Sequence, residues 1–347
     1  MNTSFTLRKM SGDALYLRKQ ARGFTLIELM VAMLLGLIVI GGVVSVFLAN
    51  LNSYDTNQAL SEVQSGSRTA FELMARDIRD AGLTGCNNGE PIANVVNNSA
   101  STWWANWNNA VIGYDHTQTD PAIVSGMPAR TAGTDSLMLL GSADTGLSVA
   151  PASASTAANF KLNETTSTLQ TGDIIMVCDP NHATIVQITN YNNSNVTVVH
   201  DTGNKVSPGN CSKGMGYPTV CTTNGNPYSF GPNSQIAALN AVDWYVGPSS
   251  IGSGTSLYRI TVNPSATSTT PQGTANEMVR NVTALTLAYH QPPSADFVSA
   301  ALISNWSAVD AVKVTLQIQS SNQRATTNAQ PITRTFVATT TIRNRAK

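Results

Sequence analysis

One acidic residue, Glu28, lies inside the apolar run "FTLIELMVAMLLGLIVIGGVVSVFLA", which covers residues 24–49. As a helix with a rise of about 1.5 Å per residue, this run would be about 39 Å long, enough to cross a hydrocarbon core of about 30 Å. An ionised carboxylate in a membrane helix costs about 2.5–3.5 kcal/mol near the bilayer centre and less near its ends, so such a residue usually has a partner. Glu28 is therefore the first candidate functional residue.

A basic leader precedes the apolar run. Its charged side chains are Arg8, Lys9, Arg18, Lys19 and Arg22 against Asp13 alone. The positive-inside rule places this leader in the cytoplasm and the rest of the chain across the membrane. A secretory signal peptide would be cut at small residues after its apolar segment. Here the distinctive small residue, Gly23, lies before that segment, so a cut after Gly23 would remove the leader and leave a mature chain that begins at Phe24.

The stretch "RGFTLIELMVAMLLG" resembles the class III signal of type IV prepilins and pseudopilins. The resemblance implies that prepilin peptidase cleaves between Gly23 and Phe24 and methylates the new amine of Phe24. It also implies that Glu28, the fifth residue of the mature chain, pairs with the N-terminal amine of a neighbouring subunit during assembly. The alternative is an ordinary membrane anchor with an incidental glutamate.

The composition argues against a nucleic-acid-binding protein. The 20 basic and 20 acidic side chains give a formal net charge of zero, so the chain has no general attraction for phosphate backbones. Only 12% of its residues are charged, against about 25% in ordinary globular proteins. A neutral hydrogen-bonding surface of this kind suits an extracytoplasmic protein.

Four cysteines, Cys86, Cys178, Cys211 and Cys221, lie on the predicted extracytoplasmic side, where disulfides persist. Four cysteines allow three pairings. Because Cys211 and Cys221 flank the loop "CSKGMGYPTVC", which is rich in Gly and Pro, we expect a local bridge there and a second between Cys86 and Cys178.

The chain has no C-x-x-C motif, and none of its four histidines has the spacing of a zinc finger. We therefore expect no metal and no cofactor.

An amphipathic helix is predicted to follow the apolar one over residues 50–82. Its apolar positions recur at steps of three and four: Leu60, Val63, Ala70, Phe71, Met74, Ile78 and Ala81. Gly82 is a candidate C-cap. One long helix is therefore expected from Phe24 to Ala81, with its second half packed under a globular domain. Three glycines, Gly36, Gly41 and Gly42, indicate either a kink or close helix packing.

The remaining residues, 83–347, are predicted to form a head domain rich in β-strands. Residues 83–135 are predicted to be a long irregular connection that contains Trp103, Trp104 and Trp107. These indoles could form an exposed platform that binds a surface or a glycan, or they could pack between this connection and a sheet, which we prefer.

Strand patterns dominate after residue 135. The runs "GDIIMVCD", "HATIVQITN" and "NVTVVHD" predict an antiparallel meander. Residues 202–235 are predicted to be a second loop-rich insertion, and the later runs "VDWYVG", "SLYRITVN", "EMVRNVTALTLAYH", "VDAVKVTLQIQS" and "TRTFVATTTIRN" predict further strands. The fold class is α+β: a long N-terminal helix packed on a mostly antiparallel sheet. The predicted divisions are a cleaved leader (1–23), a transmembrane and assembly helix (24–49), its amphipathic continuation (50–82) and the head (83–347).

Scattered blocks extend the resemblance to the minor pilins of the PilW family: "MARDIRDAGLTGC", "GDIIMVCD", "VDAVKVTLQIQSS" and "TFVATTTIRNR". This family often has one cysteine after the long helix and another near the "GD" strand, which supports the pairing of Cys86 with Cys178. The resemblance implies an inner-membrane protein that primes assembly of a type IV pilus and remains at its tip. The implied partners are prepilin peptidase, the major pilin, other minor pilins and a PilY-type tip adhesin. The pilus would serve twitching motility, DNA uptake or cell adhesion.

Two other functions remain open: a minor pseudopilin of type II secretion, and a tip adhesin that uses the loop from Trp103 to Trp107. A hydrolase is not expected, because no G-x-S-x-G, H-E-x-x-H or phosphate-loop motif occurs. The letters Asp-Thr-Gly of aspartic proteases occur at Asp144 and at Asp201. We interpret both as short loops that use Asp and Gly as turn residues. The chain is therefore not expected to be an enzyme.

Overall fold

The computed structural model describes residues 23–83, 91–107, 109–151, 158–203, 206–262, 273–326, 328–343 and 345. It confirms the predicted α+β class: a long N-terminal helix, α1, and a domain of mostly antiparallel sheet. The chain divides into an N-terminal part, 1–54, and a second part, 55–347. From here on the second part, which includes the amphipathic half of α1, is called the head, and each part is described by itself. The leader that we expect to be cleaved lies outside the described residues, except for Gly23.

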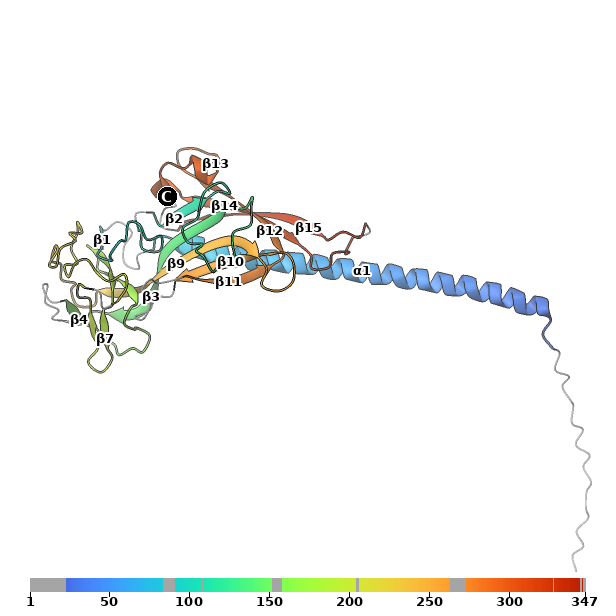
Figure 1. The fold of residues 1–347 in the computed structure, drawn as a ribbon, viewed down its shortest axis with the longest axis horizontal. Coiled ribbons are helices and arrows are strands. Elements are labelled where there is room, and N and C mark those ends of the chain that lie inside the picture. Colours follow the sequence, from blue (N-terminus) through green and yellow to red (C-terminus); the bar gives the residue numbers. More distant parts are fainter. Residues whose placement is uncertain are drawn as a thin grey trace, which may run out of the picture. The chain divides into compact units, whose positions relative to one another are not determined.

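The elements follow one another along the chain with two short 3-10 helices near the end (Figure 1). Their bounds are α1 Leu26–Asp80, β1 Ile92–Asn94, β2 Val111–Tyr114, β3 Ser136–Ser148, β4 Asn159–Lys161, β5 Ile174–Cys178, β6 Ala183–Gln187, β7 Asn190–Asn192, β8 Thr197–Val199, β9 Gln235–Pro248, β10 Thr255–Val262, β11 Gly273–Arg280, β12 Val282–His290, β13 Phe297–Val298, η1 Ala300–Leu302, η2 Trp306–Ala308, β14 Ala311–Gln319 and β15 Thr333–Thr341.

The N-terminal part contains the apolar half of α1. The helix is unbroken through Gly36, Gly41 and Gly42, and a Cβ added at any of these glycines would meet no other atom within 4 Å. Nearly every residue of this half is exposed. By length and composition it could cross a membrane. Its apolar surface therefore has no internal core to cover it, which suits a lipid environment or contact with other helices.

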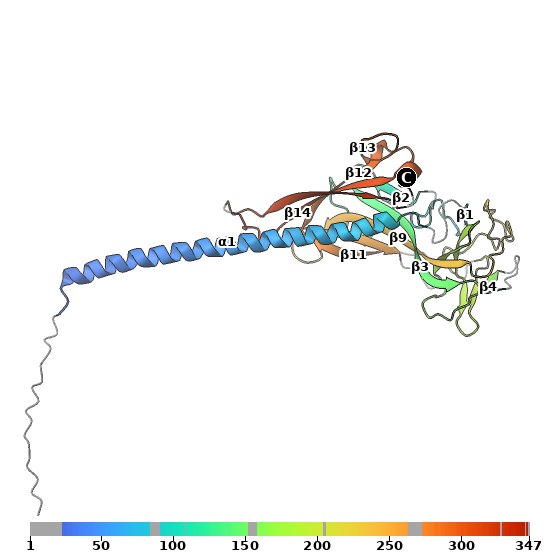
Figure 2. The same ribbon diagram turned by 180° about the vertical axis from the view of Figure 1, so that it is seen from behind.

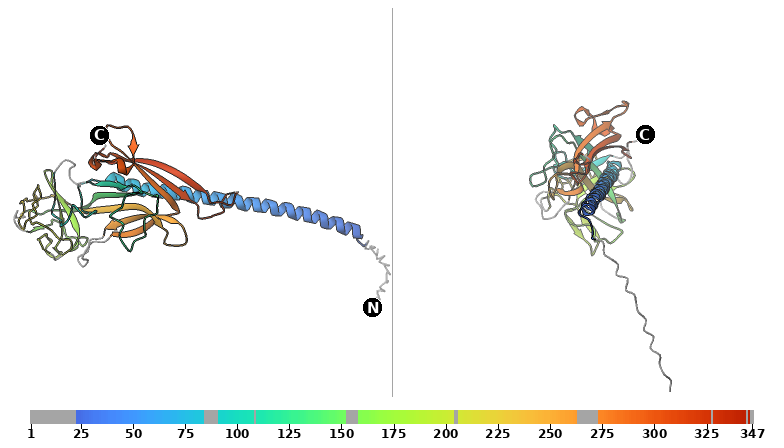
Figure 3. Two further views of the ribbon diagram at one scale, coloured as in Figure 1. Left: turned by 45° about the horizontal axis from the view of Figure 1, so that its top comes forward. Right: turned by 90° about the vertical axis from the view of Figure 1, so that its right-hand side faces the viewer.

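The second half of α1 is amphipathic, as the sequence predicts. Its buried side chains are Ala59, Val63, Ser67, Ala70, Met74, Asp77 and Ile78. Figure 2 shows this half running along the strands of the head. Figure 3 shows red strands near the C-terminus on one side of it and yellow to orange strands on the other. The helix ends where Gly82 adopts a positive φ of 76°, a conformation that glycine adopts without steric cost.

Two large sheets cover the second half of α1. In the first, the long strand β9 pairs with β3 on one edge and with β5 and then β10 on the other, and the order along the sheet is β1-β6-β5-β9-β10-β11. In the second, the order is β13-β12-β14-β15. Both sheets contribute to one core cluster with the helix, which includes Trp244, Leu287 and Leu316. Alternate residues of β14 face this core, as its alternating sequence predicts.

Four sequence expectations were wrong in detail. Residues 83–135 are not wholly irregular, because β1 pairs with β6 and β2 pairs with β3; pairing with a neighbouring strand outweighs a weak local pattern. The predicted meander breaks after its hairpin of β5 and β6, since β8 joins β4 and β7 in a separate sheet. The run "EMVRNVTALTLAYH" splits at Asn281, where φ is 61°. Asp144 lies at a β-bulge within β3 and not in a separate loop.

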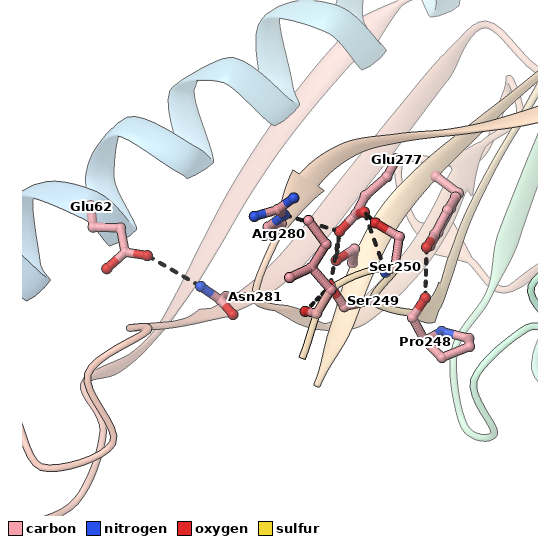
Figure 4. Close-up of polar contacts among 10 residues, drawn as sticks. Glu62, Pro248, Ser249, Ser250, Glu277, Arg280 and Asn281 are labelled. Carbon is pink, nitrogen blue, oxygen red and sulfur yellow. Dashed lines mark hydrogen bonds and ion pairs between the residues drawn. The ribbon is translucent and has the colours of Figure 1, made fainter. Parts of the chain in front are cut away.

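Glu277, a half-buried carboxylate on β11, fixes the turn between β9 and β10. Glu277 on β11 accepts hydrogen bonds from Ser249 Oγ at 2.9 Å and Ser256 Oγ at 2.6 Å, and also from the hydroxyl of Ser250 (Figure 4). Partial burial alone would raise the pKa of Glu277, but these hydroxyl donors outweigh it and lower the pKa to about 2. Glu277 is therefore ionised at neutral pH and is a structural group.

Candidate assembly site on the N-terminal helix

The start of α1 is capped by its own sequence. Thr25 Oγ1 accepts a hydrogen bond from the backbone N–H of Glu28 at 3.3 Å, and the Thr25 carbonyl accepts from the N–H groups of Glu28 at 3.1 Å and Leu29 at 3.2 Å. A threonine followed three residues later by a glutamate is the sequence of a capping box. Sequence reasoning missed this function of Thr25, although the spacing "TLIE" was sufficient to find it.

The carboxylate of Glu28 lies in the first turn of α1, where the unpaired N–H groups of the helix favour a negative charge. The residue is exposed, and among the described residues no side chain donates a hydrogen bond or forms an ion pair with its carboxylate. The helix end accounts for only about 0.3–1 kcal/mol of favourable interaction. Beyond this helix end, the described residues therefore provide no compensation for the charge of Glu28.

The expected cleavage point is accessible. Gly23 and Phe24 are exposed and precede the first helical residue, Leu26. A Cβ added at Gly23 would meet no atom within 4 Å, so the described structure gives no internal reason for glycine at this position. A requirement for glycine here would lie in recognition by the peptidase.

The tryptophan loop does not form an exposed platform of three indoles. Trp104 is buried, and Trp103 and Trp107 are half-buried against the same core cluster, which includes Cys178 and Ile185. Apolar contact with the sheet keeps the three indoles in this position. A binding surface here would have only the exposed edges of Trp103 and Trp107.

Cys211 and Cys221 form the predicted local disulfide, with their Cα atoms 4.9 Å apart. Cys178 is fully buried at the end of β5 and belongs to a disulfide. Its expected partner, Cys86, lies outside the described residues, so this second pairing stays a prediction.

Asp77, which sequence reasoning did not single out, fixes α1 to the first sheet. Its carboxylate accepts a hydrogen bond from Trp244 Nε1 at 2.9 Å and from Arg259 Nε at 2.7 Å. The Asp77 side chain is 9% exposed and that of Arg259 is 23% exposed. An ion pair and a buried indole thus join one helix position to β9 and β10.

A second buried carboxyl lies on the opposite face of β9. Neither side-chain oxygen of Asp243 has a donor group as partner among the described residues, and its carboxyl faces that of Asp120. Burial, and then the charge of Asp120, raise the pKa of Asp243 well above its usual value. Burial beside a second carboxyl thus favours the neutral, protonated form of Asp243. Asp120 accepts from Ser136 and so fixes the loop that covers this face.

The described residues contain no cluster of side chains suited to metal binding. No group of three or more His, Cys, Asp or Glu side chains in that part of the chain could hold a metal ion. A groove of about 860 Å³ runs beside Asp77 and includes Ser142 in its lining. The Ser142 hydroxyl donates to the carbonyl of Leu83 at 2.8 Å, and the groove lining contains no histidine to act as its base.

Residues 18–44 match the family model described as the prokaryotic N-terminal methylation motif. No curated protein matches the chain. The matched segment contains Gly23, Phe24, Thr25 and Glu28. The match supports a type IV pilin-like or pseudopilin protein that prepilin peptidase processes and that assembles with other pilins. It also fits a protein of the inner membrane that then enters a pilus.

Proposed function

We propose that the chain is a minor pilin of the PilW type, which primes assembly of a type IV pilus and stays in a complex at its tip. Its role is structural and not catalytic. The observation that carries the proposal is the methylation motif on a helix with two different halves. The first half of α1 is exposed and apolar, whereas the second half packs one face against the sheets of a large head.

In this proposal Glu28 is the assembly carboxylate. The bilayer interface solvates it before assembly, but a filament core would leave it buried and unpaired at a cost of several kcal/mol. The methylated amine of Phe24 on a neighbouring subunit would neutralise it and set the axial register between the two helices. The exposure of Glu28 and the absence of a partner among the described residues support this function.

The capping box provides a test that separates a local from an intermolecular role of Glu28. The cap that the structure shows uses the backbone N–H of residue 28, and glutamine suits this position of a capping box as glutamate does, so Glu28→Gln keeps the cap and removes only the charge. We expect Glu28→Gln and Glu28→Ala to reduce incorporation into pili strongly, and Glu28→Asp partly. Thr25→Ala loses a cap worth about 1 kcal/mol and should assemble nearly as the wild type does. The measurement is the ratio of each variant in sheared pili to that in the membrane, with Asp55→Ala on the same helix as control. Normal assembly of Glu28→Gln would refute the pairing.

Mass spectrometry of sheared pili tests the proposal as a whole. We expect a chain that begins at Phe24 with a methylated amine, and a full-length precursor in membranes when Gly23 is replaced by Gln. Gly231→Gln is the matched control, because Gly231 is also exposed with open space around it. Pili that contain the chain with its N-terminus at Met1 would overturn the proposal.

The second candidate, a minor pseudopilin of type II secretion, carries the same signal. Long insertions in the head, such as residues 202–235, favour the pilus. A tip adhesin is the third candidate, and burial of Trp104 leaves it less support. Saturable binding of a glycan by the chain, lost in Trp103→Ala and Trp107→Ala, would favour the adhesin.

A further inference from the structure

β15 is the last strand of its sheet, and its outer edge is long and regular. β15 is nine residues long and pairs only with β14, in an uninterrupted register from Thr333 to Thr341. Its register contains no bulge, its sequence contains no Pro or Lys, and Arg334 is its one charged residue. Proteins usually protect long edge strands with such features, because an open edge pairs with other chains.

The opposite edge of the same sheet is covered. Asp135 donates its N–H to the carbonyl of Leu285 at 2.9 Å, and its carboxylate accepts from the N–H of Leu287 at 2.8 Å. Thr255 Oγ1 donates to the carbonyl of Val282 at 2.6 Å. These groups occupy the outer hydrogen-bonding positions of β12. The fold thus protects one edge of the sheet and leaves the other without such a cover among the described residues.

The flanking hydrogen bonds show which residues of β15 face outward. Ser320 donates its N–H to the carbonyl of Ile332, and Ile342 donates its N–H to that of Asp310. In an antiparallel ladder such directly opposed hydrogen-bonded pairs recur at every second residue. The even-numbered residues of β15 therefore bond to β14. The backbone groups of the odd-numbered residues point to the open edge: Thr333, Thr335, Val337, Thr339 and Thr341.

The side chains at the edge define the chemistry of a partner strand. The five outward-bonding residues are exposed, and Val337 is 60% exposed. Phe336 is half-buried at the margin of the main core cluster. β14 and β15 contain the cations Lys313 and Arg334 and no carboxylate, and Arg343 follows. A complementary strand would carry β-branched residues in its middle and acidic residues near its ends.

A second copy of this chain fits the edge poorly. Ile332 packs with Ala59 near one end of the head's helix, and the N–H of Arg343 donates to the carbonyl of Arg79 near the other. β15 therefore runs alongside α1 in the same direction. Antiparallel pairing of two β15 strands would point residues 55–80 of the two chains in opposite directions, whereas the proposed pilin function gives all heads one common direction. Self-pairing would also bring together strands that carry basic residues and no acidic one.

We propose that the β15 edge is an interaction surface that pairs with an extended, acidic-flanked strand of a different subunit anchored in the same membrane. The pairing extends the sheet by main-chain hydrogen bonds and covers Val337 and the margin of Phe336. The exclusion of a second copy depends on the common orientation of the proposed pilin function, whereas the open edge itself does not.

Proline substitution at outward-facing positions tests the proposal. Thr335→Pro with Thr339→Pro removes two N–H groups that point to the partner and leaves the ladder with β14 intact, since proline is tolerated on edge strands at such positions. The matched control, Thr335→Ala with Thr339→Ala, keeps both N–H groups. Both full-length variants should melt within a few degrees of each other. We expect the proline variant to lose its membrane complex on native gels about tenfold or more relative to the alanine variant.

The outcomes separate the edge from the pilin function. If the wild type is absent from sheared pili but forms a membrane complex that the proline variant loses, the pilin function fails and the edge stands. If the wild type is in pili and the two variants behave alike, the edge proposal is overturned. The edge proposal is also overturned if the wild type forms no membrane complex and the proline and alanine variants behave alike. A complex that contains two differently tagged copies of this chain and depends on the edge would overturn the assignment to a different subunit.

Discussion

Replacement of Asp77 by alanine should loosen the contact between α1 and the first sheet of the head. The indole N–H of Trp244 is fully buried, and leaving it without an acceptor costs about 1–3 kcal/mol. Arg259 loses its ion pair as well, but at 23% exposure it keeps part of its hydration, so this loss is smaller than the roughly 3–5 kcal/mol of a fully buried pair. We expect a total loss of about 3 kcal/mol in the free energy of unfolding.

The assay is thermal unfolding of the full-length chain in detergent, followed by tryptophan fluorescence, because Trp244 reports on the broken contact. For a domain of this size about 3 kcal/mol corresponds to a decrease in Tm of roughly 6–12 °C. Asp77→Asn keeps an acceptor for Trp244 and should lose about 1 kcal/mol. Glu72→Ala removes an exposed carboxylate of the same helix and serves as control. An Asp77→Ala chain that melts within about one degree of the control would refute the role of this contact.

Two further predictions concern the head. The raised pKa means that the folded chain keeps a proton on Asp243 that the unfolded chain releases near the ordinary pKa of 3.8. The free energy of unfolding should therefore fall as pH rises above about 4, by up to about 1.4 kcal/mol per pH unit. Asp243→Asn removes this slope, so its Tm should equal or exceed that of the wild type at pH 8, and a variant with an unchanged pH profile would show that Asp243 is ionised. Replacing Cys211 by Ser opens the bridge to Cys221 and should cost about 2–3 kcal/mol, measured as a decrease in Tm. Reducing agent also opens the disulfide of Cys178, so it should lower the Tm of the wild type at least as far.

The parts of the fold that the sequence predicts are those with a regular local pattern. The amphipathic face of α1 follows from apolar residues at steps of three and four, and Val63, Ala70 and Met74 are buried as expected. The alternating residues of β14 likewise identify a half-buried strand. Both patterns depend only on the period of the element, so no knowledge of distant residues is needed.

The sequence is silent where a residue acts through a distant partner. Asp77 lies between charged neighbours on a helix, and only the fold shows that it faces Trp244 and Arg259. Asp243 stands in an apolar strand run, and the loop residue Asp120 that explains its burial comes from a distant part of the chain. Short strands such as β1 are equally hidden, because three residues carry too little pattern to predict a strand.

Two carboxylates on α1 show how the structure narrows the function of Glu28. Asp77 has its partners within the chain, Trp244 and Arg259, and belongs to the head. Glu28 belongs to the N-terminal part, is exposed and finds no side-chain partner among the described residues. If Glu28 acts only in the N-terminal part and Asp77 only in the head, substitutions at the two positions should have independent effects on assembly and on Tm, and these effects should add. We therefore expect Glu28→Gln to leave the Tm of the head unchanged while it reduces assembly, and Asp77→Asn to lower the Tm with assembly retained below that Tm. A chain in which Glu28→Gln lowers the Tm as Asp77→Asn does would show that Glu28 stabilises the fold and not the filament.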